Sequence, residues 1–507
     1  MSATGLAGDA TAAVYSEDVV TEARPEASSV VELDGSGYGP GVTKLGLVSK
    51  VAGQSESDAS DLDSDNEQHD DLPDEHARVC WLGTDGEGDA EPLGGLRVLD
   101  RAFLHGDIVA RAADALGQTG SVTGVHLTVD LEWPNGERRA HVCTSQLRHI
   151  RPFRPGHYVV HGNWLGRIEE VQDHVSVRFE DGAECKVLRA QPAWLIPKQH
   201  GSLFPDEEQC PYFPGLQVRA SSSFVFRNAR WVRGSYKGKM EGVVAAVEPG
   251  EVMVEWLAAG RFSSENHAAP PETMKASKLT ALTYYAYTCW QLGDHALLAP
   301  EYYGTSAVEA GTEADTEAAG LGKGLAAAQG RGGHESRRRR QKRIRRVRTG
   351  RSRALADDAP ELEHAVLVVG THTTIDVMWQ DRTTSAGMPA RELVPVSHLG
   401  EHDFWPEEYV VERVDDTLEE EQDGAEPPLQ RTGVVRSVDS RERTAVVRWV
   451  KRDARGSLLH KGSVPPGQPW YNEEEVSVYS LAEHYDYPYR LGDVVLRLVG
   501  EGADQGE

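Results

Sequence analysis

Two short stretches of the sequence concentrate the charges best able to bind another molecule. The first, residues 337–353, holds eleven basic residues and no acidic one. Import receptors bind such runs in acidic grooves, RNA binds them through its phosphates, and they can also dock on the protein's own acidic surface. Because the whole chain carries a formal net charge of −27, which repels a phosphate backbone, we favour nuclear import. The expected import signal comprises Arg337, Arg338, Arg339, Arg340, Lys342, Arg343, Arg345, Arg346 and Arg348.

The second stretch, residues 56–75, holds ten acidic residues and no basic one. Its charge is complementary to a basic protein, which makes it a candidate docking strip, and its composition fits a solvated insertion without a partner equally well. The candidate docking residues are Asp58, Asp61, Asp63, Asp65, Glu67, Asp70 and Asp71. Ser55, Ser60 and Ser64 each precede an acidic residue by three positions, as acidophilic kinases require, and phosphate would deepen the negative charge.

The motifs by which common active sites are recognised do not occur in the sequence. It has no phosphate-binding glycine loop ending in Lys-Ser or Lys-Thr, no Gly-x-Ser-x-Gly and no His-Glu-x-x-His. Its five cysteines are scattered without a Cys-x-x-Cys pair, which indicates reduced thiols in a cytoplasmic or nuclear protein and argues against zinc. No apolar run is long enough to span a membrane. We therefore expect no catalytic residue, metal, cofactor or membrane partner for this chain.

The elements that must position these charges are short strands, repeated six times. Each repeat is rich in Val or Ile, mostly alternating with other residues, and ends on an aromatic side chain: Trp81, Trp133, Phe179, Trp256, Trp379 or Trp449. A Gly-x-Val segment lies upstream of five of them, in four cases 13 to 16 residues before the aromatic, which predicts a hairpin in each repeat. The aromatic residues are of the types that form ligand cages, but their period of two turns them toward the apolar face, so we expect them in the core.

A lead-in strand, a hairpin, a turn and a closing strand form the plan of an SH3-like barrel. The predicted fold class is mainly β, with tandem SH3-like small β-barrels joined by polar linkers, one of them long, disordered and arginine-rich. The expected units are barrels at 14–100 (with an acidic insertion at 54–76), 101–152, 153–205, 211–300 (with an insertion), 361–402 and 404–488, the linker at 301–360, and the start of a truncated further barrel at 489–507.

Three stretches resemble the large ubiquitin-conjugating enzyme of type O, a hybrid of conjugating enzyme and ubiquitin ligase. They are residues 376–381, 404–411 and, most specifically, 473–484. Shorter matches follow in the family's order at 46–48, 148–153, 164–166 and 212–215. The resemblance implies SH3-like barrels that recognise clients, often basic or unassembled proteins, ahead of a coiled coil and a conjugating domain. The His-Pro-Asn motif and the catalytic cysteine of that domain do not occur in this sequence, so no active-site residue carries over.

The resulting interpretation is the client-recognition part of such an enzyme, found in cytoplasm and nucleus. Its expected partners are basic clients, an import receptor and, through a domain outside this chain, the ubiquitin pathway; nucleic acid would bind only to the arginine run. The alternatives are a chromatin or RNA reader made of the same barrels and a scaffold without an enzymatic parent. Asp181 and Asp381 are candidates for a client surface, although a carboxylate in a hairpin turn more often stabilises the turn itself.

Overall fold

The described parts of the chain are mainly β-strand, with almost no helix. The computed structural model describes residues 13–23, 44–54, 72–84, 88–198, 210–260, 268–282, 285–299, 362–413, 431–452, 469–485, 487 and 489–493. Within these ranges the strands form four sheets, and the one α-helix is the short α1 (Ser223–Asn228). The mainly-β fold class predicted from the alternating sequence is confirmed. No described helix is both long and apolar enough to cross a membrane.

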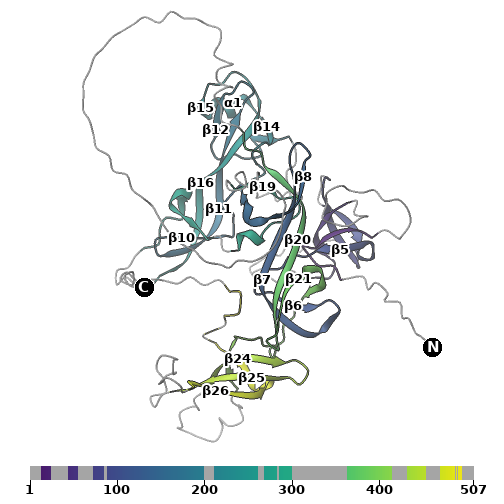
Figure 1. Cartoon of the computed structure of the whole chain (residues 1–507). Coiled ribbons are helices and arrows are strands. Elements are labelled where there is room, and N and C mark those ends of the chain that lie inside the picture. The colour runs from purple at the N-terminus through teal and green to yellow at the C-terminus, as the bar shows by residue number, and fades with distance from the viewer. Residues whose placement is uncertain are drawn as a thin grey trace, which may run out of the picture.

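The first and last sheets are each built from one continuous region. The first follows the order β4-β3-β2-β1-β5, with β1 (Val19–Glu22), β2 (Gly46–Val51), β3 (His76–Trp81), β4 (Asp89–Pro92) and β5 (Leu96–Asp100). The last follows the order β26-β25-β24-β23-β27, with β23 (Tyr409–Glu412), β24 (Thr432–Asp439), β25 (Thr444–Val450), β26 (Tyr471–Ser477) and β27 (Leu481–Glu483). Figure 1 shows the last sheet, in yellow, below the rest of the molecule.

Both of these sheets contain the predicted pairing of a glycine with an aromatic residue. Gly46 lies opposite Trp81, and Gly433 lies opposite Trp449, on neighbouring antiparallel strands. A Cβ atom on Gly46 would lie 2.5 Å from Val79 Cγ1 and 2.7 Å from Trp81 Cε3. The glycine therefore leaves the space into which the aromatic ring of the partner strand packs.

The two middle sheets join strands that are far apart in the sequence. The central sheet follows β22-β6-β7-β20-β19-β9, with β21 beside β20 and β8 beside β7. Its strands are β6 (Ile108–Arg111), β7 (Asp114–Glu132), β8 (Arg138–Cys143), β9 (Leu147–His149), β19 (His295–Leu298), β20 (Val366–Trp379), β21 (Thr384–Pro389) and β22 (Leu393–Pro395).

The other middle sheet follows the order β13-β14-β16-β11-β10-β18. In addition, β12 pairs with β11, β15 pairs with β12, and β17 pairs with β16. Its strands are β10 (Tyr158–His161), β11 (Trp164–Arg178), β12 (Glu184–Val187), β13 (Leu195–Pro197), β14 (Gln217–Ala220), β15 (Arg230–Arg233), β16 (Glu241–Ala259), β17 (Thr273–Lys275) and β18 (Thr280–Ala281). Two long antiparallel pairs, β7 with β20 and β11 with β16, run through the middle of Figure 1.

The three hairpins predicted for the middle of the chain are wrong. The segments 120–133, 166–179 and 242–256 run along single extended strands instead of turning back. Residues 126–128, where the first would have to turn, contain no residue that favours a tight turn, whereas Asp173 and Pro249-Gly250 in the other two lie at register shifts of the β11–β16 pair and do not reverse the chain. Each of the three strands finds its partner elsewhere in the chain.

The glycines of these segments pack against aromatic residues of another repeat. The pairs are Gly120 with Trp379, Gly166 with Trp256, and Gly242 with Phe179. The repeat that ends at Trp379 has no upstream Gly-x-Val segment of its own, and Gly120 supplies the glycine opposite its aromatic ring. Each glycine still packs against one aromatic residue, but the two residues of a pair come from different repeats of the sequence.

Because the long strands cross from one barrel to the next, two neighbouring cores share them. The four cores of the middle region draw on residues 103–125 with 375–393, residues 127–147 with 290–298 and 366–368, residues 153–171 with 252–279, and residues 175–195 with 212–244. The ranges 101–152, 153–205 and 361–402 therefore contribute to two cores each and the range 211–300 to three, instead of forming one barrel each. The core around Trp290 also shows that residues 290–298 open a barrel of the central sheet, whereas the sequence placed them at the end of another.

The repeated aromatic residues are core residues, as their alternation predicts. Trp81, Phe179, Trp379 and Trp449 are buried, while Trp133 and Trp256 are half-buried and pack at the edge of their cores. A ligand cage made of these side chains is therefore excluded for the four buried rings.

A 3-10 turn recurs before the last strand of five barrels. The turns are Leu93–Gly95, Thr144–Gln146, Ala276–Lys278, Ala390–Glu392 and Val478–Ser480; a further one lies at Ala286–Thr288. In each of the five, the next residue is a buried leucine: Leu96, Leu147, Leu279, Leu393 or Leu481. This closing turn fixes the direction of the last strand, because its leucine must enter the core.

Buried polar groups fix the first barrel to the central sheet. Arg101 Nε lies 3.1 Å from Asp18 Oδ1, and Arg101 Nη1 donates a 2.7 Å hydrogen bond to the carbonyl of Leu393. Asp100 accepts hydrogen bonds from the backbone N–H and the hydroxyl of Thr373, at 3.1 and 2.8 Å. Burial raises the pKa of both carboxyl groups, that of Asp18 to about 7, although Arg101 opposes the shift at Asp18. A displaced barrel would leave these groups without partners, so they hold it in one place.

Candidate interaction site

Most residues singled out from the sequence lie outside the described parts of the chain. This holds for the import signal, the acidic docking strip and the three serines. The two loop carboxylates do lie within them. Asp181 accepts hydrogen bonds from the N–H of Ala183 at 3.3 Å and from Lys237 at 2.7 Å, and Asp381 accepts the N–H of Thr383 at 2.8 Å. Both therefore stabilise their own turns, the alternative given for them above.

A cleft of about 840 Å³ opens between the last sheet and the central sheet. Its walls come from the start of β7, from the segment after β20, and from β24, β25 and β26. The charged residues that line it are Asp114, Asp381, Asp403, Asp439, Glu475, Arg441 and Arg443. Leu116 stands fully exposed at the rim. Among the described lining residues, acidic groups therefore outnumber basic ones, and an apolar side chain is available beside them.

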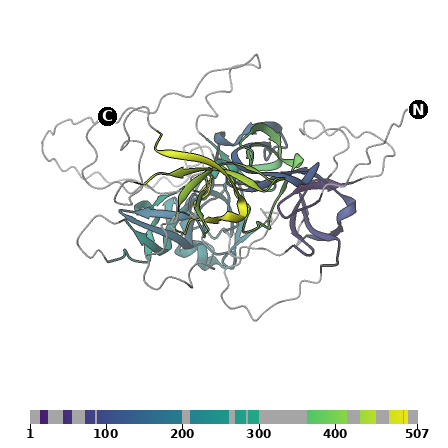
Figure 2. The ribbon, with the colours of Figure 1, turned by 90° about the horizontal axis from the view of Figure 1, so that it is seen from below.

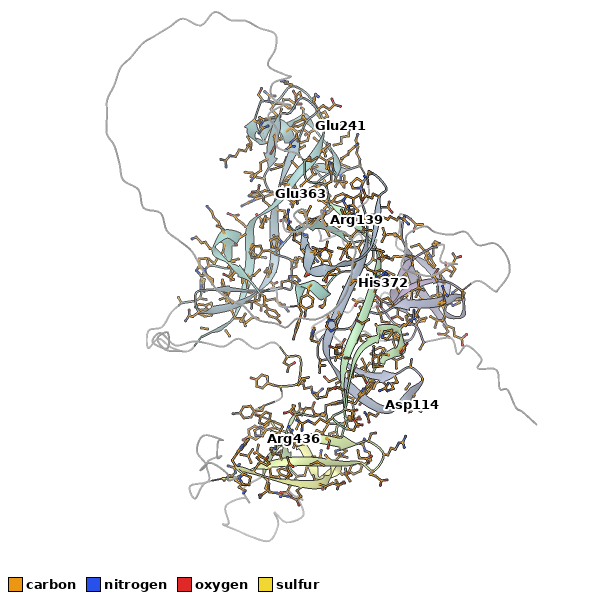
Figure 3. The ribbon with its side chains drawn as sticks, viewed as in Figure 1. Asp114, Arg139, Glu241, Glu363, His372 and Arg436 are labelled. Atoms are coloured by element: carbon orange, nitrogen blue, oxygen red, sulfur yellow. The ribbon has the colours of Figure 1, made fainter. Side chains whose placement is uncertain are left out.

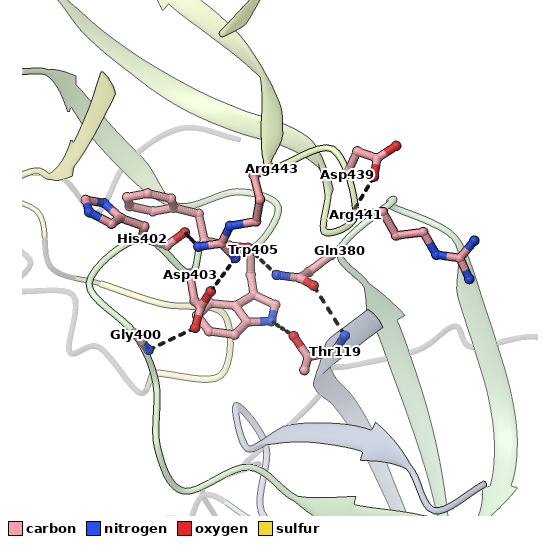
Figure 4. Close-up of polar contacts among 10 residues, drawn as sticks. Thr119, Gln380, Gly400, His402, Asp403, Trp405, Asp439, Arg441 and Arg443 are labelled. Carbon is pink, nitrogen blue, oxygen red and sulfur yellow. Dashed lines mark hydrogen bonds and ion pairs between the residues drawn. The ribbon is translucent and has the colours of Figure 1, made fainter. Parts of the chain in front are cut away.

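A set of hydrogen bonds holds the two walls of the cleft together (Figure 4). The indole N–H of Trp405 donates to the hydroxyl of Thr119 at 3.2 Å. The side-chain amide of Gln380 accepts the N–H of Thr119 at 3.3 Å and donates to the carbonyl of Phe404 at 3.1 Å, and its backbone carbonyl accepts the N–H of Val438 at 2.7 Å. Gln380 and Trp405 are both buried, so the last barrel is seated firmly on the central sheet.

The carboxylates of the cleft differ in whether they already have a hydrogen-bond donor or a cation as a partner within the chain. Asp403 accepts the N–H of Gly400 at 2.9 Å and pairs with Arg443 at 2.9 Å. Asp439 accepts two backbone N–H groups of the turn that follows it. Asp114 and Glu475, by contrast, are exposed at the mouth, and Glu475 accepts a hydrogen bond from the neutral hydroxyl of Thr444 at 2.9 Å. These two carboxylates offer the cleft's most accessible negative charge.

A smaller pocket of about 210 Å³ lies on the other side of Asp403 and contains tyrosines and carboxylates. Its lining includes Tyr409, Tyr487, Tyr489, Glu401, Glu408 and Glu483. Tyr409 and Tyr487 stack with their ring centroids 5.3 Å apart. Burial raises the pKa of Glu408 to about 7, although the backbone N–H of Trp405 and the charge of Arg490 oppose the shift.

Arg490 is one of the residues that line this tyrosine pocket. Its Nε lies 3.2 Å from Glu408 Oε1, its Nη2 lies 3.8 Å from Glu483 Oε1, and its guanidinium carbon lies 5.8 Å from the centre of the Trp405 ring. The combination of aromatic faces and carboxylates is what a guanidinium or ammonium group prefers. Arg490, together with Arg413 beside Glu401, already supplies such cations to the pocket from within this chain.

Arg490 belongs to a turn that recurs at the start of barrels, and sequence reasoning missed its role. The N–H of Arg490 donates to Asp493 Oδ2 at 2.7 Å. The same three-residue spacing joins Leu104 to Asp107 at 2.7 Å and Gln291 to Asp294 at 2.9 Å. The recurring Leu-Gly-Asp or His-Gly-Asp is the signal from which this turn is predictable. The sequence does not predict that the side chain of Arg490, the first residue of this turn, lines the tyrosine pocket.

The fold defines a class of protein: an array of SH3-like β-barrels, in which both cavities described above lie beside the last barrel. Comparison with family models identifies the particular type. Residues 155–288 match the model described as the UBE2O tandem tSH3-B domain, and residues 401–486 match the UBE2O SH3-B domain. The first match covers the interleaved pair built on β11 and β16. The chain is an N-terminal UBE2O-like region, as the resemblance of its motifs implied.

Two plant proteins are similar to this chain over most of its length. A probable ubiquitin-conjugating enzyme E2 23 of Arabidopsis thaliana is 35% identical over 470 residues, which cover 84% of this chain and 41% of that protein. A probable ubiquitin-conjugating enzyme E2 24 of the same plant is 29% identical over 408 residues, which cover 80% of this chain and 40% of that protein. The chain thus spans about two fifths of the length of these relatives.

Proposed function

We propose that this chain is the client-recognition region of a hybrid ubiquitin-conjugating enzyme and ligase. It binds basic or unassembled proteins, and a conjugating domain outside this chain transfers ubiquitin to their lysines. Two findings support this: the relatives named as conjugating enzymes are much longer than the matched region, and the junction between the last sheet and the central sheet is acidic. The cytoplasm and the nucleus are the proposed compartments, with an import receptor binding the arginine run.

The observation that carries the proposal is the position of Arg490. Its side chain provides an example of how a basic residue fits the tyrosine pocket, between Glu408 and the face of Trp405. The larger cleft lies next to this pocket, since Asp403 lines both. A basic client segment would place one cation where Arg490 now lies and further cations beside Asp114 and Glu475. Long-range attraction by the acidic surface would speed the encounter.

The experiment measures the affinity of the chain for a fluorescent lysine-rich peptide by anisotropy. Asp114→Asn combined with Glu475→Gln should weaken binding by roughly fivefold or more, because each removed carboxylate contributes up to about 1 kcal/mol at an exposed site. Asp89→Asn combined with Glu272→Gln is the matched control, since both carboxylates are exposed and lie outside the cleft. Equal weakening by both double variants would mean that only the net charge matters, and the cleft would then not be the client site.

A nucleic-acid reader built from the same barrels is distinguished by the arginine run. Deletion of residues 337–348 should leave the binding of basic proteins unchanged, because the acidic surface attracts them. The same deletion should remove most of the salt-sensitive affinity of an RNA reader for a labelled single strand. Two results together would replace the proposal with the nucleic-acid reader: the intact chain does not bind basic proteins, and the deletion abolishes its binding of RNA.

A further inference from the structure

Three potential metal ligands meet on the central sheet although they come from separate strands. Asp130 belongs to β7, His141 to β8 and His372 to β20, and β7 lies between the other two. Their ligand atoms all lie within 4.8 Å of one another. His372 Nε2 is 3.0 Å from Asp130 Oδ2, and the two imidazole rings are 4.3 Å apart between centroids. Figure 3 labels His372 on this sheet.

Irregularities in both flanking strands bring the histidines to the same place. The register of β8 shifts opposite Asp130, between Val129 and Leu131, and the register of β20 shifts between Val368 and Gly370. Such bulges redirect side chains that a regular strand would point to alternate faces. His141 sits in the first bulge with φ of 53°, and its N–H donates to Asp130 Oδ1 at 2.9 Å. The arrangement is thus held by the backbone and does not depend on the side chain of His141.

The chemistry of the three groups suits a divalent transition metal. Imidazole nitrogen and carboxylate oxygen are ligands of zinc, and three protein ligands with one open position make a common type of site. Ligands of a tetrahedral zinc ion at about 2.0–2.1 Å stand roughly 3.4 Å from each other, close to the spacing of Asp130 and His372. Asp130 is buried, His372 is half-buried and His141 is exposed, so an ion could enter from solvent.

We propose that Asp130, His141 and His372 bind one zinc ion, which ties β7, β8 and β20 together at the centre of the interleaved barrels. The sequence argued against zinc because its cysteines form no pair, but this site uses none of them. The fourth position of the ion would be open to water or to a side chain of a bound protein. The proposal is independent of the client-recognition function and of the acidic cleft.

The test uses the full chain, freed of metal with a chelator and then titrated with zinc by calorimetry and with cobalt by visible absorption. His141→Asn is the informative variant, because asparagine tolerates positive φ and keeps the backbone N–H that bonds Asp130. His126→Asn is the matched control. His126 also lies on β7 and pairs with a carboxylate of β20, Asp376, at 3.0 Å, but among the described residues it belongs to no group of three ligands.

The wild-type chain should bind one cobalt ion with the intense visible bands of a four-coordinate site and should melt at a higher temperature with zinc. His141→Asn should lower the zinc affinity at least about 100-fold, beyond the loss typical of outer-shell changes, while His126→Asn leaves it unchanged. The absence of cobalt bands in the wild type, or equal zinc affinity of wild type and His141→Asn, would overturn the proposal. In that case Asp130 serves only to hold the bulge.

Discussion

The packing of Gly120 against Trp379 gives the sharpest test of the interleaved fold. A Cβ atom at Gly120 would lie 2.5 Å from Val377 Cγ1, 2.9 Å from the carbonyl oxygen of Met378 and 2.9 Å from Trp379 Cε3. The carbonyl cannot move without breaking the sheet, and the ring is fully buried. Gly120→Ala should therefore destabilise the central sheet by about 1–3 kcal/mol, the range typical of overpacked cores.

A double-mutant cycle identifies which aromatic residue takes the space beside Gly120. Trp379→Phe shortens the ring that the new methyl group meets, so it should recover about 0.5 kcal/mol or more of the loss caused by Gly120→Ala. Trp133→Phe should show no coupling with Gly120→Ala, although Trp133 is the aromatic that follows Gly120 along the chain. Gly94→Ala is the control, since nothing lies within 4 Å of a Cβ there.

The assay is native-state hydrogen exchange of β7 and β20, because a chain of several barrels need not unfold in one step. The free energy of opening of these strands, compared among the single and double variants, gives the coupling. If Gly120 were coupled energetically to Trp133 and not to Trp379, the result would support the local hairpin and refute the interleaved arrangement.

Three further predictions concern the junctions and the charged segments. Arg101→Leu leaves the carboxylate of Asp18 buried without its cation, so it should destabilise the docking of the first barrel by about 3–5 kcal/mol, seen as faster exchange or proteolysis there. Burial raises the pKa of Glu408 to about 7 from its ordinary 4.5, so its stabilising contribution is complete below about pH 4.5 and is lost as the pH rises through 7. Glu408→Gln should remove that pH dependence, up to about 3 kcal/mol, from the melting of the last barrel; an unchanged pH profile would contradict the assignment. Replacement of residues 337–340 by alanine should move a fluorescent fusion out of the nucleus, and an unchanged distribution would leave the import signal without a role.

The sequence predicts which residues form strands and which side chains enter the cores, because both follow from local alternation. The buried rings of Trp81 and Trp449 and their glycine partners are of this kind. It does not predict the partner of a long strand, since alternation is the same whichever strand lies beside it. Trp133 and Trp379 are equally good partners for Gly120 by pattern, and the one clue is that the repeat of Trp379 lacks an upstream Gly-x-Val segment.

The candidate sites are less predictable than the fold for the same reason. Asp114 and Glu475 are unremarkable acidic residues in the sequence, and they line one cleft only because the last barrel is seated on the central sheet. His141 and His372 are likewise distant along the chain and meet Asp130 through two bulges. Charge runs such as the one at 337–348 are visible in a sequence because their members are neighbours. Sites assembled from residues of different strands are not visible in a sequence, because their members lie far apart along the chain.

The interleaving of β7 with β20 also bears on how the protein folds during synthesis. Asp130 and His372, which meet in the finished sheet, are 242 positions apart. At ordinary rates of translation β7 would wait on the order of 10 to 50 s on the ribosome before its partner emerges. During that time the pair built on β11 and β16, which lies between them in the sequence, is complete and can fold by itself. One edge of β7 can pair at once with β6 and β8, but the edge that will meet β20 stays unpaired until then and is prone to wrong pairing, so the nascent form of β7 would benefit from a chaperone.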